Sequence, residues 1–288
     1  MQFDNILFPV DFSEQCLQVS RAVNAMAHAF NSRITLLNVL TLPPQFYDSA
    51  DRSMVYGEVT LEDIRKSCEE RLQSFRARYF DGLDVSAIQV EGEPADMIRH
   101  YAETNPIDLI MMPTHGEGPF RLALLGSVTA KVLHDVKCPV WTSCHSESPI
   151  TDPFRFTSLI CAVDETEDSI PIMKAAASLS VRFTAKLVLV HALCSPTWVD
   201  SGATLPSSLE AREAHVRAQL TSLQQRAGIA VPMCINSGHL EDVVAEAARK
   251  YRANLTVIGR GHHSDDKSMF RSRVFWIVRE SPCPVLSI

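Results

Sequence analysis

Residues 111–132, MMPTHGEGPFRLALLGSVTAKV, combine residue types that can hold an anion at the start of a helix. Gly126 precedes Ser127 and Thr129, and the apolar spacing after them predicts a helix over 126–136. The first N–H groups of a helix lack partners within it and lie at the positive end of its dipole, which suits a phosphate. Gly126 would let the anion approach closely, and the two hydroxyl groups could donate hydrogen bonds. The same residues also fit a plain turn in which Ser127 only caps the helix.

A second candidate is Asp11, which follows the apolar run ILFPV at 6–10. In an open parallel sheet, ligands bind beyond the carboxyl ends of the strands, where the strand order reverses. If the first strand lies beside the fourth, Asp11 faces the loop that follows Met112. The alternative is that Asp11 merely forms the turn between a strand and a helix.

The sequence contains an internal repeat. NILFPVDFSEQ at 5–15 returns as SLICAVDETED at 158–168, so Asp11 corresponds to Asp164. Three further matches follow in the same order: ITLLNVL with LVLVHAL, DLIMMP with NLTVIG, and KCPVW with PCPVL. We therefore expect two similar domains, 1–145 and 153–288, joined by a polar linker.

Each repeat alternates apolar runs with amphipathic ones, which is typical of a parallel sheet with helices on both faces. The expected fold is α/β, with two tandem doubly wound five-stranded parallel sheets in the order 3-2-1-4-5. In the first repeat we predict strands at 4–10, 33–40, 83–90, 107–112 and 139–143, and helices at 13–30, 60–80, 94–104 and 126–136. The second repeat follows the same plan, with its first three helices at 169–183, 209–228 and 240–251. Segments 41–59 and 194–207 lack periodicity and are predicted to be loops.

Composition narrows the classes of function. The net charge of -7 and the lack of a basic patch argue against nucleic-acid binding. No apolar run is long enough to cross a bilayer, and the residues after Met1 do not resemble a signal peptide. The eight cysteines form no CxxC pair and are expected to be reduced, mostly buried thiols. We expect a cytoplasmic protein.

The segment from Met112 to Thr129, together with ILFPVD and CPVW, resembles the universal stress protein family in its ATP-binding branch. That family carries G-x2-G-x9-G-[ST] after the fourth strand and an aspartate in the first strand–helix turn. The resemblance covers both repeats. It implies a Rossmann-like, adenine nucleotide alpha hydrolase-like fold and a site for ATP or another adenine nucleotide, with or without magnesium. Carried over by position, the nucleotide-binding residues are Pro9, Val10, Asp11, Val39, Met112, Pro113, His115, Gly116, Gly126, Ser127, Val128 and Thr129.

The first glycine of the family motif is replaced here by Pro113. Proline removes an N–H and fixes φ near about −65°. If the glycine served through a positive φ or a donated hydrogen bond, the site is damaged; if it served as a packing surface, proline can replace it. Because the rest of the loop keeps its spacing, we predict a retained site in the first repeat.

The second repeat departs further from the motif. Gly259 remains, but His262 stands for Gly116, and Ser272-Arg273 stands for Gly126-Ser127. A large cation therefore follows the position where the phosphate would enter. We predict that this repeat is a structural half or a differently tuned site.

Other residues with reactive side chains have plainer explanations. HHSDD at 262–266 contains metal-capable groups, yet adjacent histidines tend to point apart, which favours a solvated loop. Arg121 could reach phosphate or lie on the surface. Cys138 and Cys283 each precede a proline and are more simply read as the start of a strand than as redox centres.

The last strand of each repeat is expected at a sheet edge with unpaired backbone groups. Strands 138–143 and 283–288 could pair within the molecule as a pseudo-dimer, and further homodimerisation stays open. We predict a stress-response protein that binds its nucleotide as a regulatory ligand. The alternatives are slow ATP hydrolysis, for which no catalytic residue is recognisable, or an interaction scaffold with a vestigial site.

Overall fold

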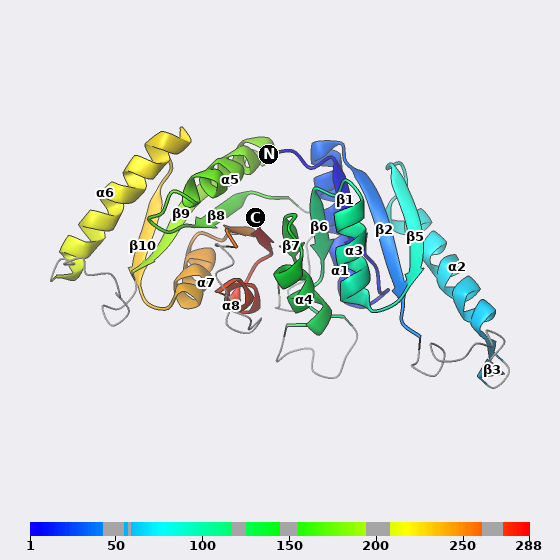
Figure 1. The fold of residues 1–288 in the computed structure, drawn as a ribbon. Helices are drawn as coiled ribbons and strands as arrows, with labels where there is room; N and C mark the ends of the chain where they lie inside the picture. The colour runs from blue at the N-terminus through cyan, green and yellow to red at the C-terminus, as the bar shows by residue number, and fades with distance from the viewer. Residues whose placement is uncertain (43–54, 57–58, 117–124, 145–154, 194–207, 261–272) are drawn as a thin grey trace. The chain divides into compact units, whose positions relative to one another are not determined.

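The fold was analysed in a computed structural model of the chain. The structure describes residues 1–42, 55–56, 59–116, 125–144, 155–193, 208–260 and 273–288. Strands and helices alternate through both repeats, and helices lie on both faces of each set of parallel strands (Figure 1).

The described elements occur in the following order along the chain. The first repeat contains β1 (Asn5–Pro9), α1 (Glu14–Phe30), β2 (Arg33–Leu40), β3 (Val55–Tyr56), β4 (Val59–Thr60), α2 (Leu61–Tyr79), β5 (Val85–Glu91), α3 (Pro94–Thr104), β6 (Leu109–Met112), α4 (Ser127–Asp135) and β7 (Val140–Thr142). The second contains β8 (Ser158–Ala162), α5 (Ser169–Phe183), β9 (Lys186–Leu193), α6 (Leu209–Ala227), β10 (Met233–Ser237), α7 (Leu240–Lys250), β11 (Leu255–Ile258), α8 (Arg273–Glu280) and β12 (Val285–Ser287).

The parallel strands have the predicted order. In the first repeat β1 pairs with β2 and β6, and β2 pairs with β5, all in parallel. In the second repeat β8 pairs with β9 and β11, β9 pairs with β10, and β11 pairs with β12. The reversal point therefore lies between β1 and β6 and, in the second repeat, between β8 and β11. This places the Asp11 turn and the loop after Met112 at the same edge of the sheet.

Local sequence explains where the helices start and stop. Ser13 caps α1 by accepting a hydrogen bond from the Cys16 N–H, and Pro94 occupies the first turn of α3. α6 ends at Gly228, which has the left-handed φ of +72° that glycine adopts without strain. All four residues of β6 and all five of β8 are buried, which is why β6 is continuously apolar and β8 is apolar apart from Ser158.

The prediction of a loop over 41–59 is wrong in part. β3 and β4 form a two-stranded antiparallel pair, with Val55 opposite Thr60 and Tyr56 opposite Val59. Strands of two residues are too short to produce an alternating pattern, so periodicity could not reveal them.

The described residues divide into two compact units. One consists of 2–140, and the other of residue 1 with 141–144 and 155–288. β7 crosses the division, and within the second unit the Thr142 hydroxyl donates a hydrogen bond to the Val285 carbonyl at 3.4 Å. The domain limits 1–145 and 153–288 and the proposed pseudo-dimer stay predictions. Among the described helices, none is long and apolar enough to cross a membrane.

Candidate functional site

The aspartate turn of the first repeat is held by local hydrogen bonds. Asp11 Oδ1 accepts from the Ser13 N–H at 3.0 Å and from the Ser13 hydroxyl at 2.7 Å. Between them, Phe12 has a left-handed φ of 64°, an uncommon conformation for a bulky residue that reverses the chain into α1. The Arg71 guanidinium lies 4.4 Å from the centre of the Phe12 ring. These contacts fix the direction of the Asp11 carboxyl group.

The second carboxylate oxygen of Asp11 faces the loop after β6. A Cβ added to Gly116 would collide with Asp11 Oδ2. A larger residue at this position would therefore displace the Asp11 carboxylate from its present place. The predicted opposition of the aspartate turn and the glycine loop is present in the fold.

The amino end of α4 is capped by Gly126, which has no side chain to accept hydrogen bonds from the first turn. A Cβ at Gly126 would lie 3.1 Å from the Thr114 carbonyl oxygen and 3.2 Å from His115 Cα, so a larger residue would push against backbone. Ser127 is exposed and Val128 is partly exposed. The helix start thus presents backbone N–H groups beside a narrow, glycine-lined surface.

Two hydrogen bonds pin the ends of the loop. The Gly126 N–H donates to the Thr114 carbonyl at 2.8 Å, and the Thr129 hydroxyl donates to the Pro113 carbonyl at 2.9 Å. Because a hydroxyl has one hydrogen, the predicted donation from Thr129 to phosphate would require this bond to Pro113 to break. Pro113 is buried, and the loop closes in this way with proline in the position of the family's glycine.

His115 is buried, and its Nδ1 lies 3.2 Å from the Thr114 hydroxyl oxygen. The predicted role of His115 in binding the nucleotide stays a prediction. Arg121 lies outside the described residues, as does the HHSDD segment at 262–266.

The remaining predicted residues lie along the strand ends. Pro9 ends β1, Met112 ends β6, and Val39 is a partly exposed residue near the end of β2. The N–H of Val10 donates to the Leu37 carbonyl at 2.9 Å, which extends the sheet to the edge of the Asp11 turn. These residues provide apolar surface and backbone on the same side as Asp11.

Asn38 helps to position the aspartate turn of the first repeat and was not predicted from the sequence. It is buried, and its amide donates a hydrogen bond to the Val10 carbonyl at 2.8 Å, directly before Asp11. The signal was a polar residue inside the apolar run ITLLNVL. Its counterpart in the second repeat, His191, interrupts LVLVHAL at the same place.

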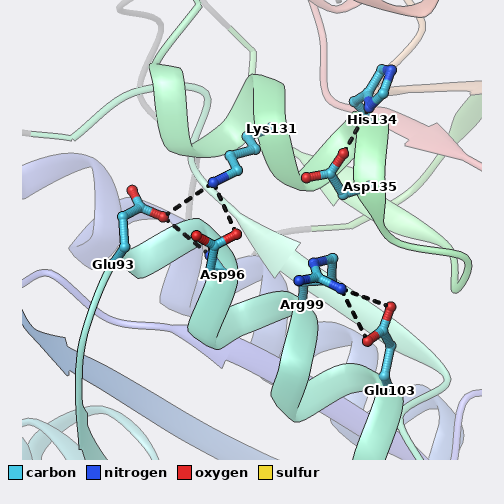
Figure 2. A network of polar contacts seen from close by, with 7 residues as sticks. All are labelled: Glu93, Asp96, Arg99, Glu103, Lys131, His134 and Asp135. Atoms are coloured by element: carbon cyan, nitrogen blue, oxygen red, sulfur yellow. Dashed lines mark hydrogen bonds and ion pairs between the residues drawn. The ribbon is translucent and has the colours of Figure 1, made fainter. Parts of the chain in front are cut away.

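Helix α4 is tied to α3 by an ionic network (Figure 2). Lys131 Nζ lies 2.9 Å from Asp96 Oδ1 and 3.6 Å from Glu93 Oε2. The hydrogen bond from Lys131 lowers the pKa of Asp96, and the same bond raises the pKa of Lys131. Exposed pairs of this kind stabilise a fold little, so their contribution is to bias the direction of α4.

In the second repeat, the corresponding turn donates hydrogen bonds to the Asp164 carboxylate. Asp164 Oδ1 accepts from the Thr166 N–H at 3.0 Å, the Thr166 hydroxyl at 2.6 Å and the Ser169 hydroxyl at 2.8 Å. Burial alone would raise the pKa of Asp164, but these hydrogen bonds and the charge of His191 outweigh it, and the pKa is lowered.

The motif glycine that the second repeat keeps, Gly259, is covered by a side chain. A Cβ at Gly259 would collide with Cδ1 of Ile172, which projects from α5. His262 and Ser272, which replace motif glycines, lie outside the described residues, and Arg273 is exposed at the start of α8. In the described part of this repeat, an apolar side chain fills the space above the glycine.

The cysteines are consistent with structural thiols. Burial raises the pKa of Cys16 and Cys161 to about 12 and that of Cys283 to about 11. A thiol with such a pKa is mostly protonated at neutral pH and therefore a poor nucleophile. Cys16, Cys161 and Cys283 form no disulfide.

Comparison with known proteins identifies the fold and the family. The model of the universal stress protein family matches residues 2–143 and again 155–288. Universal stress protein MJ0531 of Methanocaldococcus jannaschii is 27% identical over 139 residues, which span 48% of this chain and 80% of that protein. A universal stress protein of Thermus aquaticus, encoded in the QAH/OAS sulfhydrylase 3'region, is 28% identical over 141 residues, covering 48% of this chain and 96% of its own.

Solved structures match the whole chain. A universal stress protein from Archaeoglobus fulgidus aligns with a TM-score of 0.73 and 22% identity, over 99% of this chain and 96% of that one. A putative universal stress protein from Pseudomonas aeruginosa aligns with a TM-score of 0.65 and 19% identity, over 99% and 93%. Both share the fold with this chain. Since the family model matches nearly the entire sequence, and does so twice, the chain belongs to the universal stress protein family as a tandem member.

Proposed function

We propose that the first repeat binds ATP, or a related adenine nucleotide, as a regulatory ligand. The bound nucleotide would lie between the Asp11 turn and the loop that joins β6 to α4. Binding there would change the surface or the assembly of the protein and so report the energy state of the cell.

The observation that carries this proposal is the convergence of Asp11 Oδ2 on Gly116, next to a helix start that has no side-chain cap. A carboxylate accepts hydrogen bonds from sugar hydroxyls, while the N–H groups of Ser127 and Val128 and the Ser127 hydroxyl suit phosphate. The two chemistries occur side by side, as a nucleotide requires.

The proposed roles of the other residues follow from their positions. Backbone and apolar side chains at Pro9, Val10, Val39 and Met112 would enclose the base. Pro113 and Thr129 would hold the two ends of the loop together, and His115 would lie buried beside Thr114. Magnesium, where it accompanies the nucleotide, would bind chiefly through phosphate oxygens, which are the ligands it prefers.

The proposal is tested first by denaturing the purified protein and identifying any released nucleotide by mass spectrometry. Calorimetric titration of the nucleotide-free protein with ATP then measures affinity. Asp11→Ala should weaken ATP binding roughly tenfold to a hundredfold, because a hydrogen bond to a charged group contributes about 1.5–3 kcal/mol. The matched change Asp164→Ala should leave the affinity unaltered.

Each result discriminates between the candidate functions. An absence of saturable binding would refute the proposal and favour an interaction scaffold. Saturable binding with release of phosphate that is lost in Asp11→Ala would indicate an ATPase. Equal losses in the two aspartate variants would place the site elsewhere or in both repeats.

A further inference from the structure

The second repeat contains a buried histidine that contacts both ends of its aspartate turn. His191 lies in β9 and is 6% exposed. Its Nδ1 is 2.9 Å from the Val163 carbonyl oxygen, and its Nε2 is 3.4 Å from Glu165 Oε1. Val163 immediately precedes Asp164, and Glu165 immediately follows it. The imidazole thus bridges the residues on either side of the aspartate.

The two contacts demand different protons. A carbonyl oxygen only accepts, so the Nδ1 that faces Val163 must carry a hydrogen. Nε2 attracts the Glu165 carboxylate only when it carries a hydrogen as well, because a neutral ring would turn a lone pair toward the negative charge. Both contacts are therefore favourable together only in the doubly protonated, positively charged imidazole.

The first repeat offers an internal comparison. Asn38 occupies the position of His191 and makes the first contact, from its amide to the Val10 carbonyl at 2.8 Å. The residue in the position of Glu165 is Phe12, which has no carboxylate. An asparagine does not change charge with pH, so the link in the first repeat is independent of protonation.

Charged groups from the surrounding elements define the field at His191. On the aspartate turn, Glu165 is in contact with the ring and Asp164 interacts with its charge. β10 contributes no carboxyl or amino group. The helices packed on β9, α5 and α7, carry charges that are exposed to solvent, apart from the partly exposed Glu241: Lys174, Arg182, Asp242, Glu246, Arg249 and Lys250.

We propose that His191, the Val163 carbonyl and Glu165 form a pH-responsive clamp that fixes the aspartate turn of the second repeat when the imidazole is charged. Histidine is the side chain whose charge ordinarily changes between about pH 5 and 8. At the acid end of this range the clamp holds both sides of Asp164. At the alkaline end the contact with Glu165 is lost, and His191 then holds the turn to β9 only through the Val163 carbonyl.

The clamp is tested by NMR on the full-length protein between pH 5 and 8.5. The observables are the imidazole nitrogen signals of His191, assigned by their loss in His191→Asn, and the exchange protection of the Thr166 N–H. That N–H donates to Asp164 Oδ1 and so reports the order of the turn. Protection is corrected for the intrinsic pH dependence of exchange.

In the parent protein the Thr166 protection factor should fall about tenfold from pH 6 to pH 8, in step with the His191 signals, which corresponds to about 1.4 kcal/mol. His191→Asn, which installs the residue of the first repeat, should reduce the change to less than about twofold. Glu165→Gln should do the same while leaving His191 in place. Glu241→Gln is the matched control and should respond like the parent.

Three outcomes would overturn the clamp. They are constant protection in the parent protein, an undiminished response in His191→Asn, or an undiminished response in Glu165→Gln. A thermal melt of each variant confirms folding, and because the Glu165 side chain is 37% exposed, its replacement provides a test that does not disturb the core.

Discussion

The two repeats differ most at the turn that follows their first strand. In the first repeat the helix begins three residues after Asp11, Phe12 takes a left-handed conformation, and one carboxylate oxygen points at Gly116. In the second the helix begins five residues after Asp164, and Thr166 and Ser169 donate to its carboxylate. In both repeats Oδ1 of the aspartate accepts hydrogen bonds from its own turn. The first repeat differs because Asp11 Oδ2 also faces Gly116, and the second differs because Ser169 adds a further donor to Asp164 Oδ1.

The glycines above these turns carry the same contrast. Gly116 makes room for a polar group, whereas Gly259 makes room for the apolar end of Ile172. The two glycines stand at different positions of the motif, because Gly259 corresponds to Pro113 and Gly116 corresponds to His262. One faces a carboxylate and the other faces an apolar side chain. The presence of the glycine alone does not distinguish the two uses.

The largest expected effect comes from closing the helix start of the first repeat. Gly126→Val should weaken ATP binding at least about a hundredfold, because the added side chain presses on the Thr114 carbonyl and His115 backbone that border the proposed phosphate position. Calorimetric titration measures the loss, with circular dichroism to verify the fold. Wild-type affinity in a folded Gly126→Val protein would refute the phosphate position.

In the second repeat, enlarging the motif glycine Gly259 should alter stability instead of ATP binding. Gly259→Ala is expected to lower the free energy of unfolding by about 1–3 kcal/mol because its methyl group displaces Ile172. In a protein that already carries Ile172→Ala, Gly259→Ala should lower the free energy of unfolding by less, because the space beside the glycine is then open. Denaturant unfolding of the four proteins in this cycle gives the coupling energy. Additive losses would show that the two residues do not compete for space.

A loss of stability of similar size is expected when the buried hydrogen bond from Asn38 to the Val10 carbonyl is removed. Asn38→Leu should cost about 1–3 kcal/mol of unfolding free energy because it leaves the buried Val10 carbonyl without its donor. Asn38→His, the residue found in the second repeat, can donate from Nδ1 and should retain most of the stability. If both variants unfold at the same denaturant concentration, the hydrogen bond to Val10 is not what position 38 supplies.

The smallest expected effect is the acid sensitivity of the second turn. The pKa of Asp164 is lowered in the folded protein, so its contribution to stability is complete above the ordinary value of 3.8 and is lost as the pH falls through the lowered value. Asp164→Asn should therefore unfold more readily than the parent near pH 6, and the difference should disappear near about pH 2. A difference that persists unchanged at low pH would mean that the carboxylate charge is not responsible.

The repeat, the strand order and most helix limits could be predicted from the sequence because they depend on local patterns. Continuous apolar runs mark strands covered on both faces, and Ser13, Pro94 and Gly228 mark helix ends. β3 and β4 were not predicted, because a strand of two residues has no periodic pattern. Motif spacing also predicted the opposition of Asp11 and Gly116, since both follow strands that border the reversal point.

Side-chain partners were harder to foresee. The sequence suggested that the Thr129 hydroxyl faces a ligand, but its hydrogen is donated to Pro113. Neither the packing of Ile172 on Gly259 nor the bridge made by His191 follows from spacing, because each joins elements whose separation is set by the fold. A polar residue in the middle of an apolar strand was the one visible signal for Asn38 and His191.

The hydrogen bonds at the two ends of the loop between β6 and α4 have a practical consequence. Thr129 donates a hydrogen bond to Pro113 and Gly126 donates one to Thr114, so the residues just after β6 are joined directly to the first turn of α4. A fluorescent or affinity tag could be inserted between these two anchored ends. Such a graft would turn the first repeat into a sensor read directly at the place where its ligand is proposed to arrive.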